Sequence, residues 1–374
     1  MSKSTLQLAF FGNQEDGSST LIGKLLILLG CVNERVLMNF ERPEKQLSWL
    51  CNEWNSMKGM ISRNTDRMIW HWLESRNFQL VCIKVQSFTN LEVRDLALCE
   101  IGVIVLSAQV GHFENALSRF SSFRKRLTNM AALHCRALIV CVNKMDLVEW
   151  DEARFNEIEK EINLITKRMG VKTHVVPISA LDGTNVLEVS TSWFKGSSLL
   201  DILDNEMQSC HDLLEYPLRV AIIKTIMVKN QKVFIVKILT GVLTVGMMLQ
   251  LPMGSGKEQP FKVLTMERNR QRISKAIATE IVAVTLNAPF KIRSGTILSD
   301  PTHQPAEIMM EFDANVVFSA RTSLPLESSS VYISNGFTRV LCHWTKIFGL
   351  VDKNGNIIRE NIDNVQRGEI ILMR

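Results

Sequence analysis

The residues with the clearest chemical potential lie near the start of the chain, in the stretch GNQEDGSST at positions 12–20. Its spacing follows the phosphate-binding pattern G-x-x-x-x-G-K-[S/T], except that Ser18 stands where the pattern has lysine. Glycines in such a loop let the backbone turn tightly around phosphate oxygens, and the amides that open the following helix point at the anion. Ser19 is placed to offer its hydroxyl to a magnesium ion. The predicted phosphate-binding residues are Gly12, Asp16, Gly17, Ser18, Ser19 and Thr20.

The missing lysine predicts weakened binding of a triphosphate. A hydrogen bond to a charged group contributes roughly 1.5–3 kcal/mol, so its loss lowers affinity by about one to two orders of magnitude. Glu15 and Asp16 add two carboxylates to the same loop, and these repel phosphate unless they point outward. The alternative interpretation of this stretch is an ordinary strand–turn–helix connection.

A second motif, Asn143-Lys144-Met145-Asp146, directly follows the apolar run ALIVCV. N-K-x-D at the end of a buried strand is typical of a guanine reader, because the aspartate accepts hydrogen bonds from the ring N–H and the exocyclic amine, while the lysine stem packs over the ring. The stretch Ser179-Ala180-Leu181 follows another strand-like run, and its small residue lets a backbone N–H reach the guanine carbonyl oxygen. The predicted guanine-binding residues are Asn143, Lys144, Asp146, Ser179, Ala180 and Leu181.

The residues needed for hydrolysis do not accompany these motifs. A guanosine triphosphatase of this kind needs Asp-x-x-Gly after its third strand, where the aspartate supports magnesium and the glycine amide contacts the γ-phosphate. The sequence has K-V-Q-S-F at residues 84–88, with neither Asp nor Gly in place. Thr65 is a weak match to the threonine that clasps magnesium from the first switch. We therefore expect no catalytic residues and a weak magnesium site at Ser19.

Apolar runs and helical patterns alternate over the first 205 residues or so, which indicates a mostly parallel sheet covered by helices on both faces. The expected strands are Leu6–Phe11, Met68–Leu73, Phe78–Val85, Ile101–Ser107, Ala137–Val142 and His174–Ile178, and the clearest helix is Asp151–Met169. After Glu215, short Val-, Ile- and Leu-rich runs between Gly, Asn and Pro predict β-structure. Eight scattered cysteines without a C-x-x-C pair predict reduced thiols and an intracellular protein. No apolar stretch is long enough for a membrane span.

Further segments carry a resemblance to a known family. These are VPISALDGTNV at 176–186, SWFKGSSLLDILD at 192–204, and the shorter TGVLTVGM at 240–247 and RSGTILSD at 293–300. Together with the two nucleotide motifs, the chain resembles the translational GTPases of elongation factor Tu, including the eukaryotic branch of elongation factor 1-alpha and the peptide-release and ribosome-rescue GTPases. The resemblance implies an α/β P-loop G domain followed by two β-barrel domains. The expected boundaries are 1–212, 213–302 and 303–374.

The resemblance also implies strands beyond residue 374, so we expect the last barrel to be shortened. Its open edge would then be covered by a partner, or the sequence would represent a shortened isoform or gene model. We expect a monomer unless this open barrel edge pairs with another chain.

These features predict a divergent translation-factor-like protein that binds GTP or GDP, with little or no hydrolysis. GDP is less penalised than GTP, and Mg²⁺ binding is weakened, because base recognition is intact while phosphate handling is degraded. One alternative is a nucleotide-free adaptor that docks on the ribosome, tRNA or an RNA-surveillance protein. Another is an active elongation-type GTPase with unconventional residues. The expected location is cytoplasmic, with neither DNA nor a membrane as partner.

Overall fold

A computed structural model of the chain shows two compact units, one formed by residues 1–216, 237–243 and 275–282 and the other by the remainder. The structure describes residues 5–13, 15–32, 46–51, 68–74, 79–85, 98–117, 127, 130, 135–169, 171–229, 231–254, 256, 259–268, 271–288, 292–318, 322–323, 330–334, 338–352, 355–360, 362, 364–366 and 369–374. None of the helices in these ranges has the length and hydrophobicity of a membrane-spanning segment.

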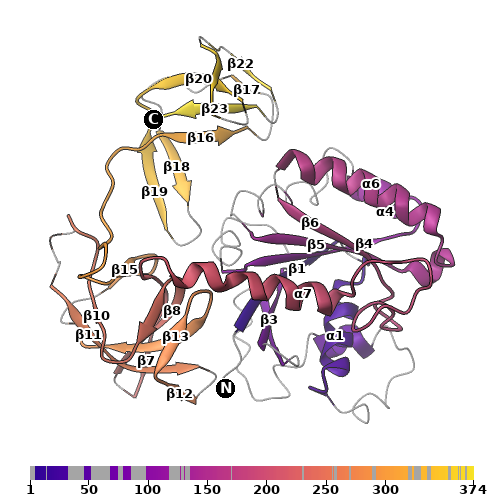
Figure 1. The fold of residues 1–374 in the computed structure, drawn as a ribbon, viewed down its shortest axis with the longest axis horizontal. Helices are drawn as coiled ribbons and strands as arrows, with labels where there is room; N and C mark the ends of the chain where they lie inside the picture. The colour runs from indigo at the N-terminus through magenta and orange to yellow at the C-terminus, as the bar shows by residue number, and fades with distance from the viewer. Residues whose placement is uncertain are drawn as a thin grey trace. The chain divides into compact units, whose positions relative to one another are not determined.

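A six-stranded sheet in the order β2-β3-β1-β4-β5-β6 forms the centre of the first unit (Figure 1). Its strands are β1 Thr5–Gly12, β2 Met68–Glu74, β3 Gln79–Val85, β4 Ile101–Ser107, β5 Ala137–Asn143 and β6 Lys172–Pro177. The pairs β1–β3, β1–β4, β4–β5 and β5–β6 are parallel, and β2 is antiparallel to β3. Every residue of β4 and β5 is buried, as expected for strands covered on both faces.

Two hydrophobic cores cover the faces of this sheet. One contains Leu21, Leu25 and other residues of α1 together with residues of α7, and the other contains Phe113 of α4 and Phe155 and Ile158 of α6. Figure 1 shows α4 and α6 on one side of the sheet and α1 on the other. The helices are α1 Ser18–Leu28, α4 His112–Leu117, α6 Glu152–Met169 and α7 Leu199–Gln208, with 3₁₀ turns η2 Met145–Val148 and η3 Ser209–Leu214. The predicted helix 151–169 is confirmed.

After residue 216, the described residues form strands and the turns that join them. One seven-stranded sheet has the order β10-β11-β14-β8-β7-β15, with β12 paired to β11. Its strands are β7 Arg219–Val228, β8 Gln231–Thr240, β10 Met248–Leu249, β11 Phe261–Arg268, β12 Gln271–Ile273, β14 Ile281–Leu286 and β15 Ile297–Ser299, while β9 Val242–Thr244 pairs with β13 Lys275–Ile277. Alternating burial along β14 shows that one face of this sheet packs on a core.

A smaller set of sheets follows. One sheet has four strands, in the order β16 Ala314–Val317, β23 Ile370–Met373, β20 Ile347–Val351 and β21 Ile357–Arg359. Two further sheets are strand pairs, β17 Thr322–Ser323 with β22 Asn364–Val365 and β18 Ser330–Ser334 with β19 Arg339–His343. Their core among the described residues contains Val365, Ile371 and Met373. The predicted fold class, an α/β domain followed by antiparallel barrel-like sheets, is confirmed. The three domain boundaries stay predictions.

The topology brings the predicted site residues together, because the carboxyl ends of parallel strands share one edge of the sheet. Backbone hydrogen bonds join the loops there. The amide of Ala108, after β4, donates to the carbonyl of Asn143 at 2.8 Å, and the amide of Met145 donates to the carbonyl of Ile178 at 3.3 Å. The loops after β4, β5 and β6 are therefore tied to one another before any ligand is considered.

Candidate nucleotide-binding site

The stretch 12–20 forms a strand–turn–helix connection with the features of an anion site. Helix α1 begins at Ser18, directly after Gly17, whose φ of 95° lies in the left-handed region. No side chain caps the helix, and its first turn contains no acidic residue. The first amides of a helix point toward its N-terminus, where they can donate to an anion, and the helix dipole favours negative charge there.

Asn143 connects this loop to the predicted guanine pocket. Its Nδ2 donates to the carbonyl of Asp16 at 2.8 Å, and its Oδ1 accepts the amide of Ala180 at 2.8 Å. A Cβ at Gly17 would lie 2.3 Å from Asn143 Nδ2, so this position requires glycine for space as well as for its φ. One buried side chain thus fixes the phosphate loop relative to the loop after β6. The motif predicted Asn143 as a site residue, but not this bridging geometry.

Asp146 lies in η2 with its side chain partly exposed. Among the residues that the structure describes, its carboxylate has no hydrogen-bond or ion-pair partner. Lys144 adopts a left-handed φ of 62°, and its Nζ lies 3.4 Å from Gln109 Oε1. An unpaired carboxylate beside a lysine stem is the arrangement that guanine recognition needs. The guanine-binding roles of Lys144 and Asp146 stay predictions.

The turn after β6 supplies the remaining predicted contacts. Ser179 is buried, and its hydroxyl donates to Asp182 Oδ2 at 3.0 Å and accepts the amide of Asp182 at 3.3 Å. The amide of Ala180 already donates to Asn143 Oδ1. The amide of Leu181, the next residue of the turn, has no hydrogen-bond partner within the described part of the chain. Ser179 and Ala180 thus shape the turn, and Leu181 is the candidate donor to a base carbonyl.

The two carboxylates of the phosphate loop differ in placement. Glu15 is exposed, whereas Asp16 is only 3% exposed and its Oδ2 accepts the amide of Asn13 at 2.9 Å. Burial raises the pKa of Asp16 above its ordinary value, and this outweighs the hydrogen bond from Asn13 and the charges of Lys144 and His112, which lower it. The loop therefore holds a buried acid whose ionised form opposes a bound phosphate.

Arg154 on α6 is a supporting residue that the motifs did not indicate. Its Nε donates to the carbonyl of Ala108 at 3.0 Å and its Nη2 to the carbonyl of Gln109 at 3.5 Å. The guanidinium also forms ion pairs with Glu114 at 2.8 Å and Glu157 at 2.7 Å. Arg154 thus fixes the loop after β4, and the side chain of Gln109 in that loop contacts Lys144. Of these contacts, only the Arg154–Glu157 ion pair, whose residues are three positions apart on one helix, could be predicted from the sequence.

Ser18, Ser19 and Thr20 form the first turn of α1, as expected for the end of a phosphate-binding loop. A protein-built magnesium site does not fit the described residues, which contain no group of three or more His, Cys, Asp or Glu side chains able to hold a metal ion. Ser19 is the magnesium ligand that the sequence predicts, and its single hydroxyl supplies only one oxygen ligand to Mg²⁺. Thr65 and the segment 86–88 lie outside the described residues.

Comparisons with known proteins identify the family of the chain. The family model of the elongation factor Tu GTP-binding domain matches residues 3–209. Elongation factor 1-alpha of Plasmodium falciparum is 25% identical over 399 residues, covering 99% of this chain and 87% of that protein, and the Saccharomyces cerevisiae protein of the same name is 26% identical over 379 residues, covering 92% and 79%.

Among solved structures, the GTP-bound GTPase-like domain of S. cerevisiae Ski7 superposes with a TM-score of 0.66 at 16% identity, covering 99% of this chain and 89% of that one. That likeness concerns the fold alone. The family match extends over more than half of the 374 residues. The chain therefore belongs to the elongation factor Tu family of translational GTPases.

Proposed function

We propose that this protein binds guanine nucleotide, with GDP held at least as well as GTP, and hydrolyses GTP weakly or not at all. The observation that carries the proposal is a contrast within one site. The Asp146 carboxylate and the Leu181 amide have no partner among the described residues, and Asn143 already joins the two loops. The phosphate loop, by contrast, has Ser18 in place of lysine and a buried acid at Asp16.

In the proposed complex, Asp146 accepts hydrogen bonds from the guanine ring N–H and the exocyclic amine, and Leu181 donates its amide to the base carbonyl. The stem of Lys144 packs over the ring. The α- and β-phosphates lie at the N-terminus of α1, where backbone amides supply the donors. A γ-phosphate adds charge that no lysine at position 18 neutralises, so the diphosphate loses less affinity than the triphosphate.

Weak hydrolysis follows from the sequence, which has no Asp-x-x-Gly after β3. Without that aspartate and glycine, magnesium and the γ-phosphate lack two contacts of the transition state. As a member of this family without efficient turnover, the protein would act in translation or in ribosome-linked mRNA quality control. The proposed partners are the ribosome, tRNA or an RNA-surveillance protein, in the cytoplasm.

A nucleotide-free adaptor is the second candidate. It is favoured by one specific observation, the buried Asp16 inside the phosphate loop, because an ionised acid there opposes any phosphate. In that case the guanine pocket is a remnant, and the protein contributes its surface to an assembly.

Titration with a fluorescent N-methylanthraniloyl derivative of GDP tests the proposal. We expect saturable binding that Asp146→Ala weakens by at least about 100-fold, because two hydrogen bonds to a charged group contribute roughly 1.5–3 kcal/mol each. Glu149→Ala is the matched control, since it removes an exposed carboxylate three residues away and leaves the pocket intact. Equal binding by the Asp146→Ala variant would contradict the pocket assignment, and no binding by the wild-type protein would favour the adaptor.

A further inference from the structure

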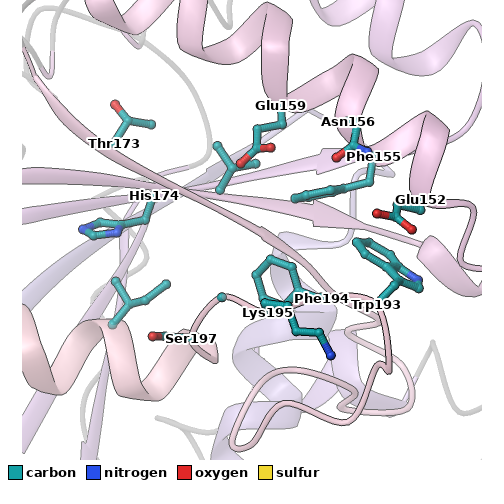
Figure 2. A pocket seen from close by; sticks show the side chains of 13 residues that line it. Glu152, Phe155, Asn156, Glu159, Thr173, His174, Trp193, Phe194, Lys195 and Ser197 are labelled. Atoms are coloured by element: carbon teal, nitrogen blue, oxygen red, sulfur yellow. The ribbon is translucent and has the colours of Figure 1, made fainter.

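A cavity of about 530 Å³ lies beside β6, the edge strand of the central sheet, and the proposed function does not use it. Its walls come from α6, from Thr173, His174 and Val175 of β6, and from the loop 193–197. Figure 2 shows Phe155, Asn156 and Glu159 projecting from α6, across from the loop that carries Trp193, Phe194 and Lys195. The cavity is lined by the middle of β6, whereas the nucleotide site lies beyond the carboxyl end of that strand.

The outer edge of β6 offers free backbone groups. Ile178, just past the strand, donates its amide to Val142 and accepts from Met145, so both of its backbone groups point toward β5 and η2. The Pro177 carbonyl points the other way and accepts from Asn185 Nδ2 at 2.9 Å. Because backbone groups alternate in direction along a strand, those of Thr173 and Val175 also point away from β5. In the described part of the chain, no strand pairs with this edge.

Three aromatic rings form the floor of the cavity. The ring centroids of Phe155 and Trp193 are 5.4 Å apart, those of Phe155 and Phe194 are 5.8 Å apart, and those of Trp193 and Phe194 are 6.1 Å apart. A Cβ at Gly196 would lie 2.4 Å from the Phe194 ring, so the loop needs glycine there to keep this arrangement. The indole Nε1 of Trp193 is buried without a hydrogen-bond partner among the described residues. The floor of the cavity therefore presents aromatic side chains.

The charge of the cavity is acidic. The carboxylates of Glu152 and Glu159 line the α6 wall, and neither has a partner in the described ranges. The cation of the opposite wall, Lys195, donates to the carbonyl of Ser192 in its own loop at 2.9 Å. Two unpaired carboxylates above aromatic rings favour a lysine or arginine side chain, because both the ion pairing and the cation–π attraction act on the same group.

We propose that β6 binds an extended segment of a partner protein, which adds as a further strand along this edge and places a lysine or arginine side chain in the cavity. Main-chain hydrogen bonds to Thr173 and Val175 supply the alignment, and the cavity supplies specificity, as in recognition by strand addition. The basic side chain lies between the Trp193 ring and the carboxylates of Glu152 and Glu159. This surface does not depend on nucleotide binding.

Selection from a phage library of random twelve-residue peptides on the immobilised wild-type protein tests this proposal. We expect enriched peptides that alternate β-branched residues with at least one lysine or arginine. A synthetic copy of an enriched peptide should bind with a measurable Kd. Replacing its basic residue with glutamate should abolish binding.

Two sets of variants separate the backbone and charge contributions. Val175→Pro removes the outward amide and should lower affinity at least tenfold, whereas Val175→Ala keeps that amide and serves as the control. Glu152→Gln combined with Glu159→Gln changes only solvent-accessible carboxylates, so it should preserve folding and lower affinity about five- to tenfold. The proposal fails if no such peptides are enriched, or if binding is unchanged by both Val175→Pro and the double glutamine variant.

Discussion

At the residue scale, the proposed weakening of phosphate binding depends on two positions of the phosphate loop. Ser18 removes a cation that the family pattern supplies, and Asp16 adds a buried acid. In the proposed function the two residues act in the same direction, since a lost cation and an added carboxylate each disfavour a phosphate group at the start of α1. Glu15, although adjacent, is exposed and more effectively screened by solvent.

Replacing Asp16 with asparagine should raise the affinity for GDP about tenfold, which corresponds to about 1.4 kcal/mol. The amide keeps an acceptor for the Asn13 N–H and removes the charge. The pKa of Asp16 is raised by burial, so the neutral form grows as the pH falls toward that pKa. Wild-type affinity for GDP should therefore increase on acidification, and the Asp16→Asn variant should show less of this increase. Calorimetric titration across the pH range measures both effects.

The matched control for Asp16→Asn is Glu15→Gln, which removes the exposed carboxylate of the same loop. It should change GDP affinity by less than about twofold, because charges in water interact weakly. Equal effects of the two variants would show that overall loop charge matters and that burial at position 16 does not.

Gly17 provides a second test at the level of one residue. Gly17→Ala should destabilise the fold by about 1–3 kcal/mol and abolish GDP binding, since the new Cβ would strain a left-handed φ and displace the Asn143 amide. Gly30→Ala is the control, because Gly30 also has a positive φ, of 69°, but open space around its Cβ. It should cost only about 1 kcal/mol and leave GDP binding unchanged. Urea unfolding and nucleotide titration of both variants check this, and equal loss of binding would contradict the bridging role of Asn143.

Among the secondary-structure elements, β6 and α7 are joined by the buried carboxylate of Glu206. It lies 2.6 Å from Lys172 Nζ and 2.9 Å from His174 Nε2. Burial raises the pKa of Glu206, but the hydrogen bonds and charges of Lys172 and His174 outweigh this and hold the pKa below its ordinary value of 4.5. A lowered acid pKa contributes stability that is present above the ordinary value and is lost as the pH falls through the folded-state value.

Glu206→Gln should therefore lower the free energy of unfolding by about 1–2 kcal/mol at neutral pH. The expected effect is modest because Lys172 is largely exposed and solvent weakens its ion pair. The difference from the wild-type protein should shrink in acid, below the ordinary carboxyl range. Urea unfolding at neutral and acidic pH measures this. The exposed Glu188→Gln variant should behave like the wild-type protein at both, and a difference that persists in acid would contradict the ionic role of Glu206.

The strands of the first unit could be predicted to within about two residues, because β4 and β5 are continuous apolar runs buried on both faces. The amphipathic period of residues 151–169 likewise predicted helix α6. The sequence could not show that Arg154 contacts the carbonyl of Ala108, since the two are 46 residues apart and nothing in either local pattern reports the other. For the same reason, the burial of Asp16 against the neighbouring loops was visible only in the structure.

For the molecule as a whole, nucleotide should stabilise the first compact unit, which contains every predicted contact. Six of the seven tryptophans belong to that unit, and Trp344 belongs to the other. Fluorescence of a Trp344→Phe variant therefore reports on the first unit alone. At 100 times the Kd, GDP should add about 2.7 kcal/mol to its unfolding free energy. ADP is the control nucleotide and should cause no shift in the urea transition, and equal shifts with both would contradict guanine recognition.

Calorimetric titration of the intact chain with GDP and GTP, with and without Mg²⁺, is the sharpest test of guanine recognition with degraded phosphate handling. We expect saturable binding of both nucleotides, GDP at least as tight as GTP, a small effect of Mg²⁺ and a gain in GTP affinity in Ser18→Lys of about one to two orders of magnitude. Tight, magnesium-dependent binding of GTP with rapid turnover would contradict it, as would the absence of binding by either nucleotide.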